Sequence, residues 1–222
     1  TKVTTPNKPD TIPFYSVIPE SITTNPYWLN KEHSEGIYTV TETSLIGQPV
    51  TDIPLQVQFN LTVSGKTYSV FRPVLYKYTD PVKGELYRNV EILPKVTVNF
   101  KEKNYILNNG KKKLVSFTVK ANTSNISGTV KINDAKNWDI KLLSSEIKLK
   151  KKNDEQTFYA EIAPLNVDNP AITLNAVAVI DNKEYTSSIS RIEHDHIPPQ
   201  FILSTAKCKV ISLNISKKKK LI

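Results

Sequence analysis

Apolar and polar residues alternate along much of this chain, and this period of two constrains its fold more than any other feature. The run "LQVQFNLTV" (55–63) places five apolar residues at every second position, on one face of an extended strand. Similar alternation occupies residues 114–121, 127–133, 146–150, 157–163 and 172–180. Helical periodicity is nearly absent. Strands of this length, separated by turn residues, predict an all-β fold built from antiparallel β-sandwiches.

Length and composition describe a globular protein. The chain has 222 residues, of which 39% are hydrophobic and 23% charged, and this length suffices for one large or two ordinary domains. No apolar run approaches the roughly 20 residues that span a bilayer, so we expect no membrane span. Because the first residues lack the apolar core of a signal peptide and the sequence contains no Met, we interpret the chain as a piece of a longer protein. The single cysteine, Cys208, excludes an intrachain disulfide and a cysteine-based metal site.

The net charge of +9 comes almost entirely from lysine, which supplies 27 of the 30 basic residues. Recognition of bases and phosphates favours the planar guanidinium of arginine, so we expect no nucleic-acid partner. The lysines cluster in short runs at 110–113, 148–154 and 217–220. We interpret these runs as solvated turns and strand edges that resist aggregation, and a polyanion-binding face is the alternative.

A weak internal repeat organises the chain. "VSGKTY" (63–68) and "IDNKEY" (180–185) share an apolar residue, two turn-forming residues, a lysine and a tyrosine. Ser64-Gly65 and Asp181-Asn182 suit tight hairpin turns, and a long apolar strand precedes each. Downstream, each copy has a similar strand ending, "YKYTDP" (76–81) and "HDHIPP" (194–199), then about a dozen linker residues before a new strand.

The repeat sets the expected domain boundaries. Trp28 and Trp138 hold similar places in the two copies, and a buried indole commonly anchors a sandwich core. Copy two has three strand-like runs before its tryptophan, whereas copy one has only residues 12–18. Copy one is therefore a reduced sandwich, or its first strands lie upstream. We predict two tandem immunoglobulin-like antiparallel β-sandwich domains, at 1–93 and 94–205, and a lead-in strand of a further module at 206–222.

Two stretches in the second half resemble a known module. They are "YILNNGKKKLVSFTVKANTSNISGTVKI" (105–132) and "NWDIKLLSSEIKLKKKNDEQTFYAEIAP" (137–164). Together they resemble the immunoglobulin-like sandwich appended to α-galactosidases and other secreted bacterial enzymes. The resemblance implies a β-sandwich fold for this half.

A second resemblance covers residues 12–222. "IPESITTNPYWL" (18–29), "SLIGQP" (44–49), "FRPVLYKYTDPVKGELYR" (71–88) and "HDHIPPQ" (194–200) resemble the middle region of large PIG-L (LmbE-like) deacetylases of Bacteroidetes-type bacteria. The zinc motif of that family, an "AHPDDE"-type run, is absent from this sequence. The resemblance therefore implies the non-catalytic part of a hydrolase, whose partners are the flanking domains of the same polypeptide. It also implies a secreted, periplasmic or cell-surface location.

"HDH" (194–196) is the candidate metal site. His194 and His196 alternate along a strand, so both side chains can share one face. Zinc needs three or four ligands, and His33, Glu193 or Asp195 would have to complete the set. The corresponding residues of copy one are Tyr76 and Tyr78, which do not bind zinc. We therefore expect strand-end packing here and no metal or other cofactor.

An aromatic cluster is the candidate carbohydrate site. Tyr27, Trp28, His33 and Tyr38 lie within "NPYWLNKEHSEGIY" (25–38) and could stack against sugar rings. The alternative is that Trp28 belongs to the core, as its repeat partner Trp138 suggests. A nucleophile elbow, a P-loop and a dinucleotide-binding glycine motif are all absent from the sequence. We predict non-catalytic structural or spacer modules of a PIG-L-type N-acetylglucosaminyl deacetylase-like hydrolase. The alternative is a carbohydrate-binding module that targets such an enzyme to a polysaccharide.

Overall fold

The computed structural model describes residues 7–8, 11–34, 36–48, 55–108, 110–133, 137–166, 171–194 and 197–213, with residues 197 and 198 described for their backbone alone. Strands dominate these residues, which also include two short 3-10 helices, η1 (Tyr27–Leu29) and η2 (Thr43–Leu45). The prediction of an all-β chain is confirmed. In this part of the chain, no helix is long and apolar enough to cross a membrane.

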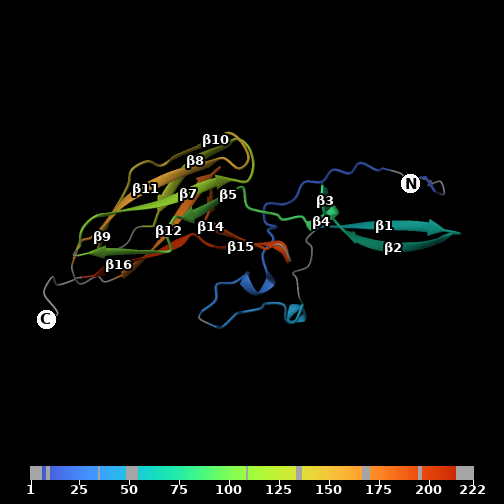
Figure 1. The fold of residues 1–222 in the computed structure, drawn as a ribbon, viewed down its shortest axis with the longest axis horizontal. Helices are drawn as coiled ribbons and strands as arrows, with labels where there is room; N and C mark the ends of the chain where they lie inside the picture. Colours follow the sequence, from blue (N-terminus) through green and yellow to red (C-terminus); the bar gives the residue numbers. More distant parts are fainter. Residues whose placement is uncertain are drawn as a thin grey trace.

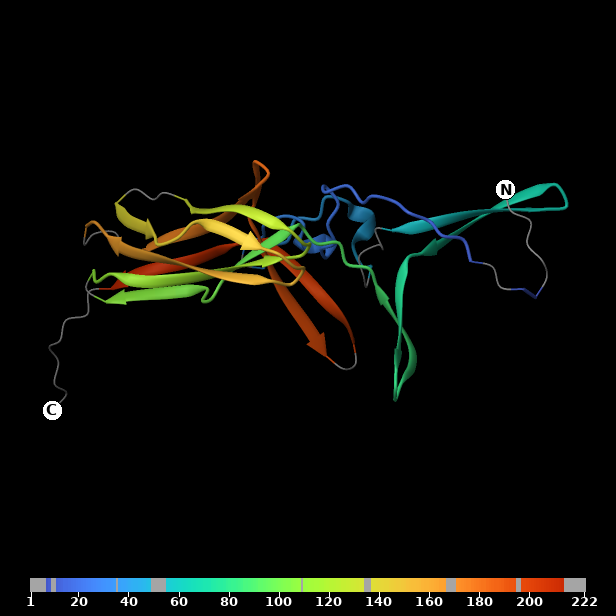
Figure 2. The ribbon, with the colours of Figure 1, turned by 90° about the horizontal axis from the view of Figure 1, so that it is seen from above.

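Two sheets in the second half of the chain pack face to face (Figures 1 and 2). The first has the order β10-β8-β12-β16-β6, with β13 beside β12, and the second has the order β5-β7-β11-β9. Neighbouring strands are antiparallel except β16 and β6, which are parallel. We call this unit the sandwich. Its first sheet comprises β10 (Glu146–Leu149), β8 (Ile126–Ile132), β12 (Ala171–Ile180), β16 (Lys207–Leu213), β6 (Asn104–Asn108) and β13 (Lys183–Tyr185). Its second sheet comprises β5 (Val96–Phe100), β7 (Lys113–Ala121), β11 (Glu155–Pro164) and β9 (Trp138–Leu142).

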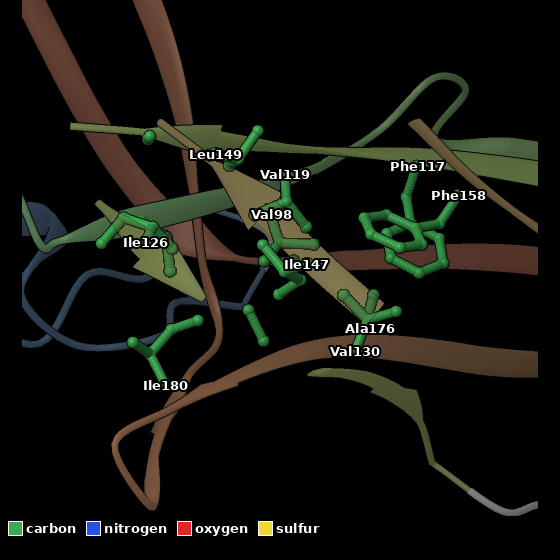
Figure 3. Close-up of a cluster of buried hydrophobic side chains, with 14 residues drawn as sticks. Val98, Phe117, Val119, Ile126, Val130, Ile147, Leu149, Phe158, Ala176 and Ile180 are labelled. Carbon is green, nitrogen blue, oxygen red and sulfur yellow. The ribbon is translucent and has the colours of Figure 1, made fainter. Parts of the chain in front are cut away.

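The alternating residues of both sheets form the core of the sandwich. In β7, every second side chain from Val115 to Ala121 is buried. Phe117 from β7 stacks against Phe158 from β11, with ring centroids 5.6 Å apart (Figure 3). Each fully buried phenylalanine stabilises the fold by about 2 kcal/mol relative to an exposed one. Trp138 is buried in an adjoining cluster with Leu174 and Cys208 from the opposite sheet, as expected for a core anchor.

The two repeated turns both form hairpins. Ser64 and Gly65 have φ of 48° and 78°, and they join β1 (Gln56–Val63) to β2 (Lys66–Pro73). Asp181 and Asn182 have φ of 50° and 61°, and they join β12 to β13. Positive φ at both central residues is the mark of a type I′ turn, whose twist matches that of the flanking strands. The hairpin predictions are therefore confirmed at both sites.

A first sandwich at 1–93 is not confirmed by the described residues. They contain two separate hairpins, β1–β2 and the pair β3 (Leu75–Asp80) and β4 (Gly84–Asn89), which do not pair with each other. All eight residues of β1 are exposed, so no second sheet within the described part of the chain covers this strand. The expected strand at 12–18 is irregular and exposed. Pro13 interrupts this run and lacks the N–H that strand pairing requires.

A third hairpin replaces part of an expected linker. β14 (Ser187–His194) and β15 (Ile197–Thr205) are antiparallel partners, although the residues after 199 were expected to form a linker. β4 likewise occupies residues expected to be a linker. Proline lies behind both errors, because it suggested the end of a strand. Pro81 precedes β4, and Pro198 and Pro199 lie within β15.

The expected lead-in strand after residue 205 belongs to the sandwich. β16 pairs with β12 and β6, and it buries Cys208 and Val210 in the core. The alternation "CKVISL" was recognised as a strand, but its partners lie more than thirty residues earlier in the chain, and no local signal identifies them. The division at 205 is thus wrong for residues 207–213, and residues 214–222 lie outside the described residues.

Burial of Cys208 gives a test of this placement. Removal of the thiol from water raises its pKa to about 12, because burial disfavours the thiolate. A raised pKa keeps the thiol protonated and unreactive at pH 8. We expect Ellman's reagent to leave the native protein unlabelled and to label one thiol per chain in urea. Stoichiometric labelling without denaturant would show that β16 is not docked in the sandwich.

Candidate functional site

The candidate site is the junction between the β14–β15 hairpin, the sandwich and the segment around η1. A two-stranded hairpin leaves the outward N–H and C=O groups of both strands unpaired. Ile189 of β14 and Leu203 of β15 are direct cross-strand partners. The outward backbone groups of both residues are available for partners outside the hairpin, as in a non-hydrogen-bonded antiparallel pair.

Asn25 occupies the outer edge at Leu203. The Leu203 backbone N–H donates to Asn25 Oδ1 at 3.0 Å, and Asn25 Nδ2 donates to the Leu203 carbonyl at 3.4 Å. The same amide group donates to the Leu29 carbonyl at 2.9 Å, which ties it to the end of η1. One side-chain amide therefore replaces a neighbouring strand at this position.

Asn99 does the same on the opposite edge. The Ile189 N–H donates to Asn99 Oδ1 at 3.0 Å, and Asn99 Nδ2 donates to the Ile189 carbonyl at 2.7 Å. Asn99 belongs to β5 of the sandwich. One cross-strand pair of the hairpin is thus held between the sandwich and the η1 segment. We call the bonds of Asn25 and Asn99 the double clamp.

Two further contacts fix the segment before η1. Thr24 exchanges hydrogen bonds with Ile92: its N–H and hydroxyl both donate to the Ile92 carbonyl, and the Ile92 N–H donates to Thr24 Oγ1 at 2.8 Å. Glu20 bridges two lysines, with Lys95 Nζ at 2.8 Å and Lys183 Nζ at 2.6 Å. These contacts attach residues 20–25 both to the residues just before β5 and to the β12–β13 turn.

The bridging position changes the acidity of Glu20. Hydrogen bonds from Lys183 and Lys95 lower the pKa of Glu20 from 4.5 to about 2. Because the folded pKa lies below the unfolded one, the contact stabilises the fold above about pH 4.5 and loses its effect as the pH falls toward 2. All three side chains are substantially exposed, so the contribution is small and is screened by salt.

We expect an NMR titration to report this shift directly. The Glu20 carboxyl carbon should titrate with a midpoint near 2, and Lys183→Ala should move that midpoint toward the ordinary value. A Glu20 midpoint near the ordinary glutamate value of 4.5, unchanged in Lys183→Ala, would mean that the bridge does not form.

An open groove lies beside the double clamp. Its volume is about 480 Å³, and it lies between residues 23–33 and the strands β14, β15 and β16. Glu32 lies in its wall and accepts hydrogen bonds from Thr205 Oγ1 at 2.9 Å and Lys207 Nζ at 3.2 Å. These donors, Thr205 first, lower the pKa of Glu32. The groove is therefore polar, and its carboxylate is ionised at neutral pH.

The four predicted aromatic residues do not form one platform. Tyr27 is buried and makes an edge-to-face contact with the half-buried Trp28, with centroids 4.8 Å apart. His33 and Tyr38 form a second pair, with centroids 4.7 Å apart and planes tilted by 32°. Of the four, only His33 lines the groove. The first pair belongs to η1, which contacts β15, and the second remains exposed at the surface.

The predicted metal pair falls partly outside the described residues. His194 is exposed at the end of β14, whereas Asp195 and His196 lie outside the described residues. In the part of the chain that the structure describes, no group of three His, Cys, Asp or Glu side chains could hold a metal ion. The residues of copy one, Tyr76 and Tyr78, stack with centroids 5.8 Å apart, and Arg88 donates to the Tyr78 hydroxyl at 3.0 Å.

Sequence reasoning missed Glu20, Asn25 and Asn99. A weak signal exists for Asn99, because asparagine is unfavourable within strands and Asn99 takes one of the polar positions in the alternation of "KVTVNF". Asn25 precedes Pro26, a pair that marks turns. Neither signal identifies the partner, which lies 90 residues away for Asn99 and 178 residues away for Asn25.

Comparisons with known proteins identify no family. No protein-family model matches the chain, and no curated protein matches it. Among solved structures, it is similar to a family 123 glycoside hydrolase from Clostridium perfringens, described for glycolipid glycan hydrolysis. The identity is 9% and the TM-score 0.35, and the match covers 56% of this chain and 28% of that one. A likeness at this level carries no argument about function.

Proposed function

We propose that this chain is a non-catalytic structural connector, which holds neighbouring parts of a larger PIG-L-type hydrolase in a fixed orientation. The double clamp carries the proposal. Asn25 and Asn99 join the η1 segment and the sandwich through opposite edges of the β14–β15 hairpin. A flexible linker is not expected to hydrogen-bond the backbone groups on both edges of a hairpin at the same cross-strand pair. The sequence also lacks the zinc motif of the deacetylase family, which supports a role outside catalysis.

We further propose that the sandwich is an immunoglobulin-like module. Its two sheets, antiparallel except where β16 pairs with β6, share an alternating core, and strands distant in sequence lie side by side, as β8, β12 and β16 do. A buried tryptophan supports the core from β9. Modules of this kind are stable frames on which connecting segments can be anchored.

Removing the amide of Asn25 tests the connector. In Asn25→Ala, the Leu203 N–H and C=O lose their partners, and an unsatisfied group costs about 1–3 kcal/mol when partly buried. We expect the Leu203 amide to exchange hydrogen at least about tenfold faster, because tenfold corresponds to about 1.4 kcal/mol. Hydrogen-exchange NMR provides the measurement, and Ile189, which is held by Asn99, provides an internal reference.

Asn30→Ala is the matched control, because Asn30 is exposed at the end of η1. It should leave exchange at both Leu203 and Ile189 unchanged. If Asn25→Ala also leaves Leu203 exchange unchanged, the amide does not clamp the hairpin and the connector proposal fails.

Carbohydrate binding is the second candidate function. The observation in its favour is the exposed pair of His33 and Tyr38 beside the polar groove, since Tyr38 keeps 51% of its surface exposed. A flat exposed ring next to a carboxylate and amide groups suits a sugar with apolar and hydroxyl faces.

Calorimetric titration with N-acetylglucosamine oligomers tests this candidate. Saturable heat that Tyr38→Ala abolishes would support it. Tyr15→Ala should bind as the native chain does, because Tyr15 is exposed and lies outside the His33–Tyr38 pair. No heat, or equal binding by Tyr38→Ala, would exclude the aromatic pair as a sugar site.

A further inference from the structure

The β1–β2 hairpin has one apolar face that nothing in the described chain covers. Val57, Phe59, Leu61 and Val63 alternate along β1, and they remain 37–61% exposed. The pairing Leu61↔Tyr68 and Phe59↔Val70 adds two apolar side chains of β2 to the same face. Figures 1 and 2 show this hairpin extending away from the sandwich. An isolated two-stranded hairpin is only marginally stable in water, so a face of this kind calls for a second layer.

The opposite face of the hairpin is mostly polar, although it also carries the exposed Phe71 opposite Gln58. Gln58 Nε2 donates to Asn60 Oδ1 at 3.0 Å, and Ser69 Oγ donates to the same oxygen at 2.8 Å. The Thr62 and Thr67 hydroxyls bond each other across the strands at 3.2 Å. The hairpin thus shows the pattern of a half-buried antiparallel sheet, with one polar face and one face meant for a core.

The internal repeat shows what covers the equivalent face in copy two. When the sequences are aligned on their two type I′ turns, Val63 matches Ile180 and Phe59 matches Ala176. In β12, the alternate residues on this face are all buried against the second sheet of the sandwich; they are Leu174, Ala176, Ala178 and Ile180. The same alternate positions are therefore apolar in β1 and β12. They differ in that a second sheet covers those of β12, whereas those of β1 are exposed.

Charge argues against a second copy of this chain as the cover. Lys66 and Arg72 lie opposite Val63 and Val57, at the two ends of the apolar face. The chain carries a net charge of +9, so two copies packed face to face would bring like charges together. A partner with acidic side chains at its rim would pair with these ends.

We propose that the β1–β2 face is half of a second sandwich core, bound by an antiparallel β-sheet from a different polypeptide segment. That sheet carries Val, Ile, Leu or Phe on its inner face and acidic residues at its rim. The inference concerns an interaction surface outside the double clamp. Failure of the connector proposal would not affect it.

Photocrosslinking tests the proposal. Benzoylphenylalanine replaces Phe59 in the chain as it is made in its own cells, and the crosslinked residues are mapped by mass spectrometry. We expect crosslinks to alternate apolar residues of extended segments with acidic neighbours. The matched control places the probe at Asn60, on the polar face, where crosslinking should fall at least about tenfold.

Sedimentation of the purified chain completes the test. A monomer across the accessible concentration range is expected. Crosslinks between two copies together with a dimer in sedimentation would overturn the proposal in favour of self-association. Crosslinking from position 59 no stronger than from position 60 would overturn it as well, because the face would then have no partner.

Discussion

The structure depends on how the free edges of one hairpin are satisfied. β14 and β15 pair with each other, and each has an outer edge of unpaired backbone groups. Asn99 from β5 occupies one edge at Ile189, and Asn25 occupies the other at Leu203. Because Ile189 and Leu203 are cross-strand partners, the two asparagines hold the same point of the hairpin from opposite edges. The η1 segment and the sandwich are therefore joined through a hairpin and not through a flexible chain.

Hydrogen bonds contribute more than ion pairs to the stability of this junction. The hydrogen bonds made by the side-chain amides of Asn25 and Asn99 are partly buried. If they are lost, water does not replace them as partners of the backbone groups of Leu203 and Ile189. The Glu20 bridge to Lys95 and Lys183 is exposed and contributes orientation more than stability. The sandwich core supplies the fixed frame, since Phe117, Phe158 and their neighbours in the two sheets are fully buried.

Sequence periodicity predicted those parts of the fold that local physics determines. The alternation in β7, β11 and β12 can be recognised in the sequence because one face of each strand is buried. The turns at 64–65 and 181–182 can be recognised because they require residues that tolerate positive φ. The pairing of strands distant in sequence could not be predicted. β16 joins β6 and β12, and Asn25 joins Leu203, through contacts that span long stretches of chain. The aromatic residues were found but not their grouping, because the burial of Tyr27 depends on how η1 packs against β15, which is distant in sequence.

The central claim is that the η1 segment and the sandwich move as one body. Spin labels at Lys31→Cys, just after η1, and at Ser144→Cys, on the sandwich, measure this by double electron–electron resonance. The buried Cys208 should remain unlabelled. The account predicts a single narrow distance distribution that broadens in Asn25→Ala. A broad distribution in the otherwise native chain, unaltered by Asn25→Ala, would contradict it.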